Sequence, residues 1–295
     1  MPWEWPVGGL CAFLLALITT PAGVSGAVLL LPVQLSVLHV PSPAVTPTNL
    51  LFNVASVPGG LLRFWQERRL LSPLTRTLVA GTLPGVVVGA VIRVELLSGQ
   101  REFTLVAAFV LLPIGLWLLL GGRRLPPTPR TPTARAYRVI WMLALVVGTV
   151  GGIYGIGGGS LIAPILIAAG FAAYEVAPAT LAATFLTSLV GIAAYQVLAW
   201  SHGGAIAPDW ALGAWLGAGG FAGSYLGARL QRRLPEASIR RLLGLVACAV
   251  AARYIQTAAS HPHTTSSKVA AAGSHTLTAS VADHVQHPLA APRYR

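Results

Sequence analysis

The chain has 295 residues, of which 55% are apolar and only 9% are charged, and its mean hydropathy is +0.70. Soluble domains carry about 25% charged residues, so this composition excludes a soluble globular protein, and the abundance of Leu, Val, Ile and Ala excludes collagen-like and disordered chains. The net charge is +12, but the basic residues lie in short stretches between apolar segments. That placement is typical of membrane topology signals and argues against nucleic acid as a partner. We therefore predict an all-α membrane protein.

Six apolar segments are predicted to be transmembrane helices, because most of them approach the length of about 17–25 residues that crosses hydrocarbon. In chain order they are residues 47–65, 77–92, 103–120, 178–200, 210–226 and 239–255. The first contains Pro58-Gly59-Gly60, which predicts a bend or an interruption in that helix.

Two further apolar segments are each divided by a glycine-rich stretch. Residues 21–26 separate pieces at 7–20 and 27–40, and residues 151–159 separate pieces at 139–150 and 160–169. At 1.5 Å per residue, a piece of about 10–14 residues reaches only the middle of a bilayer, and glycine lets the backbone turn there. Each divided segment is therefore predicted to be a broken or re-entrant helical hairpin.

The two halves of the chain match each other at a nearly constant spacing. Gly23, Gly26 and Pro32 match Gly155, Gly158 and Pro164, and the triplet Gly81, Gly85 and Gly89 matches Gly219, Gly223 and Gly227. Glycines spaced by four residues share one helix face, which predicts close helix packing, with a pore lining as the alternative. We predict a first transmembrane repeat at 1–120, a basic cytoplasmic linker at 121–138, a second transmembrane repeat at 139–257 and a disordered tail at 258–295.

The placement of basic residues predicts how the repeats are oriented. If each broken hairpin enters and leaves on one side, each repeat crosses the membrane three times, so the two repeats are inverted. Fourteen of the 20 Lys and Arg residues then lie on one side, whereas complete crossings by the broken segments remove this asymmetry. The positive-inside rule favours the first arrangement, with the basic side in the cytoplasm.

A helix that begins just after each break directs free N–H groups and its positive dipole end into the middle of the protein, which suits an anion. Polar uncharged residues share one face of the helix that follows each break. Together these features predict a substrate-binding site formed by Ser25, Gly26, Asn49, Asn53, Gly157, Gly158, Gly159, Ser160, Thr180 and Thr184. A purely structural kink and polar packing between helices are the alternatives.

Catalytic chemistry has no candidate residues in this sequence. No Asp, Glu or Lys lies deep within a predicted span, and no nucleophile–base pair or metal-ligand spacing is present. We therefore expect no enzyme activity, no cofactor and no metal. The expected partners are a small anion and membrane lipid, and a homo-oligomer is left open.

Two motifs resemble the TauE/SafE family of sulfite exporters and related anion permeases. They are Gly-Ile-Tyr-Gly-Ile-Gly-Gly-Gly-Ser-Leu-Ile-Ala-Pro at 152–164 and Pro-Thr-Asn-Leu-Leu-Phe-Asn-Val at 47–54, and the resemblance covers about residues 7–255. The first repeat departs from it, with Ser25-Gly26-Ala27 where the second has three glycines. The resemblance implies a permease of the bacterial inner membrane for sulfite, sulfonates, thiosulfate or related anions.

The sequence as a whole predicts an integral membrane permease that moves a small anion by alternating access between the two repeats. An anion channel is one alternative, since it would share the site without alternating. A non-transporting membrane partner that assists the assembly of another complex is the second.

Overall fold

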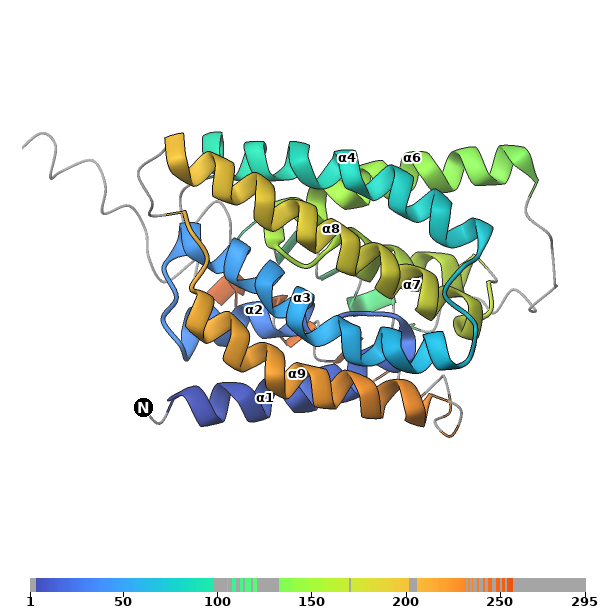
Figure 1. Ribbon diagram of the computed structural model, residues 1–295, viewed down its shortest axis with the longest axis horizontal. Coiled ribbons are helices and arrows are strands. Elements are labelled where there is room, and N and C mark those ends of the chain that lie inside the picture. The colour runs from blue at the N-terminus through green and yellow to red at the C-terminus, as the bar shows by residue number, and fades with distance from the viewer. Residues whose placement is uncertain are drawn as a thin grey trace, which may run out of the picture.

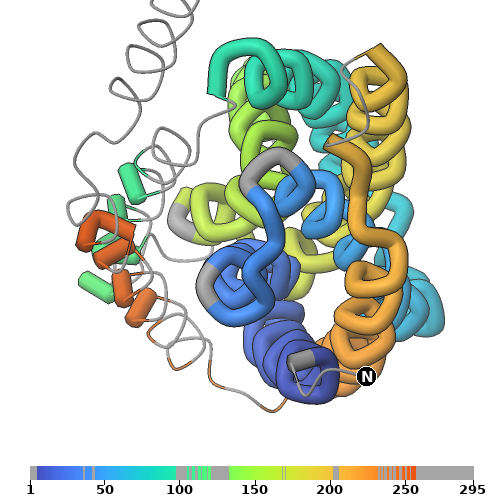
Figure 2. The backbone as a smooth tube through the Cα atoms, turned by 90° about the vertical axis from the view of Figure 1, so that its left-hand side faces the viewer, coloured from blue at the N-terminus to red at the C-terminus, as the bar shows by residue number. Residues whose placement is uncertain are grey.

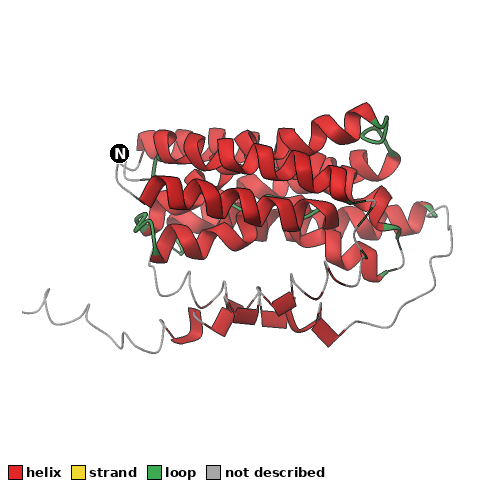
Figure 3. Cartoon of the chain, turned by 90° about the horizontal axis from the view of Figure 1, so that it is seen from below, coloured by secondary structure: helices red, strands yellow, loops and turns green. Residues whose placement is uncertain are grey.

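The computed structural model describes residues 4–97, 133–169, 171–201 and 206–231, with scattered positions between 105 and 120 and between 233 and 256. These described residues form a bundle of long helices and contain no strand (Figures 1 and 3). The predicted helices at 103–120 and 239–255 are described only at scattered positions, all of which are helical. The tail at 258–295 lies wholly outside the described residues, and so does the linker as far as residue 132.

The helices occur in the same order in the two halves of the chain. The first half has α1 (Glu4–Thr19), the 3-10 helix η1 (Thr20–Ala22), α2 (Ala27–Ser36), α3 (Ser42–Gln66) and α4 (Pro73–Glu95). The second half has α6 (Ala134–Tyr154), α7 (Gly158–Ala168), α8 (Ala173–Ser201) and α9 (Trp210–Leu230). A long helix is thus followed by a break, a short helix and two long helices, in each half.

Four segments among the described residues are long and apolar enough to cross a membrane: Trp5–Ala22, Pro73–Glu95, Ala134–Tyr154 and Ala173–Ser201. Large apolar side chains are exposed on their outer faces, Val146 and Val197 among them. A soluble protein rarely exposes so much apolar surface to water, whereas in a membrane protein such a surface is in contact with lipid. The predicted class, an all-α membrane protein, is confirmed.

Contacts along α3 fix the directions of its neighbours. Thr48 near the start of α3 accepts a hydrogen bond from the N–H of Asp209 (2.9 Å), and Gly60 near its end donates to Ser224 Oγ (3.2 Å), so α3 and α9 are parallel. Against α8, the order is reversed, because Leu50 lies next to Gly191 and Gly60 lies next to Leu181. Helices α3 and α8 are therefore antiparallel.

Glycines bring two further helix pairs into backbone contact. A side chain at Gly81, Gly85 or Gly89 of α4 would collide with the carbonyl oxygens of α6 residues 141, 145 and 149. A side chain at Gly219, Gly223 or Gly227 of α9 would collide with those of α1 residues 9, 13 and 17. The residue numbers of the two contacting helices increase in the same direction, so the helices of each pair are parallel. The prediction that these triplets pack helices is confirmed.

Helices α1, α3 and α9 thus run in one direction, and α4, α6 and α8 run in the other (Figure 1). Viewed along the bundle from the end where α1 begins, α1 and α9 lie together at the bottom, and α4, α6 and α8 lie at the top (Figure 2). The first long helix of each half therefore packs against the last described long helix of the other half.

Two sequence expectations about breaks were wrong. Helix α6 continues through Gly151 and Gly152 as far as Tyr154, so it has 21 residues rather than a half-length, and it begins at Ala134 inside the predicted linker. Helix α3 runs unbroken through Pro58-Gly59-Gly60. The glycines there face α9, where a side chain at Gly59 would collide with the carbonyl of Phe221. In both places glycine serves close helix packing rather than a turn.

Candidate functional site

Both helix breaks turn at a glycine in the left-handed backbone region. Gly23 has φ 74° at the end of η1, and Gly155 has φ 67° at the end of α6. Side chains of L-residues disfavour this region, and a helix that ends in it usually ends at glycine. The second break contains only residues 155–157, and its last residue, Gly157, also has a positive φ of 72°. The turn is therefore made at the same relative position in each half.

The short helices α2 and α7 begin at the breaks and return toward the ends from which α1 and α6 started. They lie behind α3 and α8 in Figure 1. The two breaks meet directly, since the backbone N–H of Ser25 donates to Ser160 Oγ at 3.1 Å. The positive ends of two helices, one from each half of the chain, thus point into one region of the interior.

Side chains of α3 and α8 join this meeting point. The side-chain oxygen of Asn53 on α3 accepts a hydrogen bond from the Ser25 hydroxyl, and its amide N–H donates to the carbonyl of Gly155 (3.3 Å). Thr184 on α8 shares a hydrogen bond of 3.3 Å with Ser160. All four side chains are buried. A continuous polar network therefore links both breaks with both central helices.

Asn49 and Thr180, also predicted for the site, hold backbone carbonyls. Asn49 donates to the carbonyl of Ala27 at the start of α2 (3.0 Å) and accepts from Gln34 Nε2 (3.0 Å). Thr180 donates to the carbonyl of Gly23 at 2.9 Å. Each break is thus fastened by the central helix of the other half, Gly23 by α8 and Gly155 by α3.

The predicted glycines lie in the walls of the same region. Gly157 and Gly159 pack against Thr184 and the carbonyl of Thr180, and Gly26 packs against the backbone of α1. The N–H of Gly158 donates to Thr187 Oγ1 at 3.3 Å. All ten predicted residues are buried around the two breaks.

The chemistry available there is hydrogen bonding by neutral groups. Hydroxyls, amides and backbone N–H groups donate protons, and none of the ten residues titrates near neutral pH. Such a set of donors can bind an anion and release it unchanged. Among the described residues no group of His, Cys, Asp and Glu could hold a metal ion.

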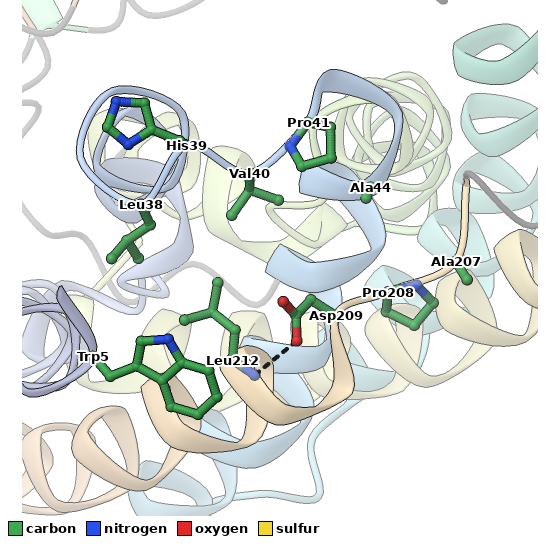
Figure 4. Close-up of a pocket in the computed structure, with 10 residues that line it drawn as sticks. All are labelled: Trp5, Leu38, His39, Val40, Pro41, Ala44, Ala207, Pro208, Asp209 and Leu212. Carbon is green, nitrogen blue, oxygen red and sulfur yellow. Dashed lines mark hydrogen bonds between the residues drawn. The ribbon is translucent and has the colours of Figure 1, made fainter. Parts of the chain in front are cut away.

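A pocket of about 270 Å³ opens at the end of the bundle where α1, α3 and α9 begin (Figure 4). Trp5 and Leu212 line one side, and His39, Val40 and Pro41 line the other. Asp209 lies between them, and its carboxylate accepts the N–H of Leu212 (2.9 Å). None of the ten predicted residues lines this pocket, but Ala44 at its wall lies one turn before Thr48 and Asn49 on α3.

Sequence reasoning missed several residues beside the site. Arg93 directly follows the predicted transmembrane helix at 77–92. Its side chain is only 1% exposed, and its Nε donates to Thr46 Oγ1 (3.4 Å). Thr46 donates in turn to the carbonyl of Ile153, two residues before Gly155 (3.2 Å). The signal was present, because Arg93 continues the four-residue spacing of Gly81, Gly85 and Gly89.

Comparison with known protein families matches residues 9–254 to the family described as Sulfite exporter TauE/SafE. Searches of curated proteins and of solved structures gave no match. The family match spans both halves of the chain, including every helix break and every predicted site residue. The members of this family are membrane transporters. The chain therefore belongs to the TauE/SafE sulfite exporter family of membrane transport proteins.

Proposed function

We propose that this protein is a permease that moves a small anion, such as sulfite, an organosulfonate or a related sulfur or organic anion, across the bacterial cytoplasmic membrane. The observation that carries the proposal is the direct contact between the starts of α2 and α7, where Ser25 bonds to Ser160. Discontinuous helices at corresponding positions of two repeats are the arrangement that holds substrate in many transporters.

The substrate site consists of the donors around this contact. Ser25, Asn53, Ser160 and Thr184 bond to one another in the structure. An anion that enters between the two breaks exchanges these internal acceptors for its own oxygens, so each donor stays satisfied. Gly26, Gly157, Gly158 and Gly159 let the backbone approach the anion, and Asn49 and Thr180 hold the backbone of the breaks in place.

The transport mechanism is alternating access between two inverted repeats. Each long helix runs opposite to its equivalent in the other half: α1 to α6, α3 to α8 and α4 to α9. These opposite directions support the arrangement. Its orientation follows from charge, since the described arginines at 63, 68, 69, 76, 135, 138 and 229 all belong to helix ends and turns on one side. That side is cytoplasmic by the positive-inside rule. The pocket beside Asp209 is then the external entrance.

Thermal unfolding of the purified protein against an anion panel tests the proposal. The panel holds sulfite, sulfate, thiosulfate, methanesulfonate, acetate and chloride at matched ionic strength. A ligand at a hundredfold excess over its dissociation constant stabilises the folded state by about 2.7 kcal/mol. We expect a selective shift for one class of anion, reduced in Ser160→Ala and in Thr184→Val.

Thr149→Val serves as the matched control, because its hydroxyl bonds to the carbonyl of Leu145 in its own helix (3.1 Å) and to no other group among the described residues. A shift of full size in both site variants contradicts the proposed site. Counterflow in liposomes then separates a carrier from a channel, since only a carrier accumulates labelled anion against trans substrate. A wild-type protein that binds no anion and copurifies with a stable partner supports the assembly role instead.

A further inference from the structure

Arg93 occupies the next position, four residues on, in the row of α4 glycines that contact α6. Positions 81, 85 and 89 of α4 lie on the carbonyls of residues 141, 145 and 149. Position 93 follows at the same spacing, and its side chain bonds to Thr46, which in turn donates to the carbonyl of Ile153. The row of α9 glycines that contact α1 continues in the same way. After positions 219, 223 and 227 comes Gln231, whose Nε2 donates to the carbonyl of Pro21 at 2.7 Å.

The two halves thus place different chemistry at one equivalent position. Gly155 follows Ile153 by two residues, and Gly23 follows Pro21 by two residues, so each position lies beside one helix break. The first carries a permanent cation, because an arginine stays protonated inside proteins. The second carries a neutral amide, and its Oε1 is buried with no hydrogen-bond partner among the described residues.

Arg93 lies close enough to act on an anion at the breaks. Its side chain is 1% exposed, next to Tyr154 and Tyr195. Its Nε donates to Thr46, whose own backbone carbonyl packs against Gly155. The guanidinium is therefore separated from the second break by a single residue. Salt screens such a buried charge only weakly, so its field reaches the site.

We propose that Arg93 supplies the fixed positive charge that attracts the anion to the helix breaks, and that the neutral Gln231 limits the site to one such charge, which suits a singly charged anion. This inference rests on the proposed function and deepens it, because it selects a monovalent oxoanion as the substrate class. Arg93 acts as a specificity-determining residue through its field and needs no contact with the anion.

Calorimetric titration of the full-length protein in detergent tests the inference with three probes of similar shape. Methanesulfonate carries one charge, sulfate carries two, and dimethyl sulfone is neutral. Gln231→Arg adds a second charge while Arg93 is retained, and we expect it to tighten methanesulfonate binding about tenfold and sulfate binding about a hundredfold. Arg93→Gln weakens both by the same factors, and Arg93→Lys preserves them. Dimethyl sulfone binding does not change in any of these variants.

Gln66→Arg is the matched control, since it adds the same charge at the exposed end of α3, away from both breaks, and we expect wild-type affinities from it. The double variant Arg93→Gln with Gln231→Arg restores wild-type affinity, which a purely structural role of Arg93 does not predict. If Gln231→Arg binds both anions within twofold of wild type, the inference is overturned and the proposed function stands. If the wild type binds no anion at all, the proposed function fails and the inference fails with it.

Discussion

Asn53 is a residue that bonds to both helix breaks at once. Its oxygen accepts from Ser25 in the first break, and its amide donates to the carbonyl of Gly155 in the second. It is 0% exposed, so water cannot replace either bond. This one amide therefore bridges the two halves of the site, in addition to the direct bond between Ser25 and Ser160.

Asn53→Leu keeps the approximate volume of the side chain and removes both hydrogen bonds. We expect the free energy of unfolding to fall by about 2 kcal/mol or more, because a buried hydroxyl and a buried carbonyl lose their partner. The lowered midpoint of thermal unfolding in detergent measures this loss. Thr149→Val is again the control, and equal midpoints for the two variants would contradict the bridging role.

At the level of single residues, sequence spacing predicted which polar residues lie at the breaks better than it predicted their hydrogen-bond partners. Asn49, Asn53, Thr180 and Thr184 were predicted from helix periodicity, and each is buried against a break. The bonds from Asn53 to Gly155 and from Thr180 to Gly23 could not be predicted, because they join the two halves of the chain. Arg93 was missed, because an arginine at the end of an apolar segment normally reaches the membrane surface.

The helices form two parallel pairs, α1 with α9 and α4 with α6, in which backbones touch along a row of glycines. Such contact allows close packing between helices in lipid, where apolar side chains gain little by associating. Each pair joins one helix from each half of the chain. The two halves are therefore interleaved along these pairs and do not form separate bodies.

Gly85→Leu tests the importance of that contact. A side chain at Gly85 would collide with the carbonyl of Leu145, so α4 and α6 must separate or the protein cannot fold. We expect loss of the monodisperse peak in size-exclusion chromatography, and the same for the equivalent Gly223→Leu. Ala80→Leu, on the exposed face of α4, leaves the peak unchanged. A monodisperse Gly85→Leu protein would show that the glycine contact is dispensable.

The length of the apolar segments predicted that the helices exist, but it did not predict where each helix ends. The breaks at Gly23 and Gly155 were predicted because both halves contain them. The predicted end of α6 was wrong by several residues, since Gly151 and Gly152 resemble a turn in sequence but pack on α4. A glycine that permits a turn and a glycine that permits contact look alike until the neighbouring helix is known.

On the scale of the whole molecule, the arrangement places the α3–α4 turn and the α8–α9 turn at opposite ends of the bundle (Figure 1). The α3–α4 turn contains Arg68 and Arg69 and is cytoplasmic in the proposed orientation. The α8–α9 turn is then external.

Cysteine labelling in intact cells checks this orientation. After replacement of Cys11 and Cys248 by serine, we expect Ala207→Cys to react with a membrane-impermeant maleimide, because it lines the pocket at the external end. Leu71→Cys, which lies in the highly exposed α3–α4 turn, reacts only after the cells are permeabilised. Labelling of Leu71→Cys in intact cells would reverse the orientation.

The mutual fastening of the breaks has a consequence for how the protein is made. While only the first half has been synthesised, the carbonyl of Gly23 lacks the Thr180 hydroxyl that donates to it, and the N–H of Ser25 lacks its acceptor on Ser160. The first half must therefore wait in the membrane with its polar interior incomplete until α8 has been inserted. The second half is thus needed to complete the polar interior of the first, and a first half expressed alone lacks both hydrogen-bond partners.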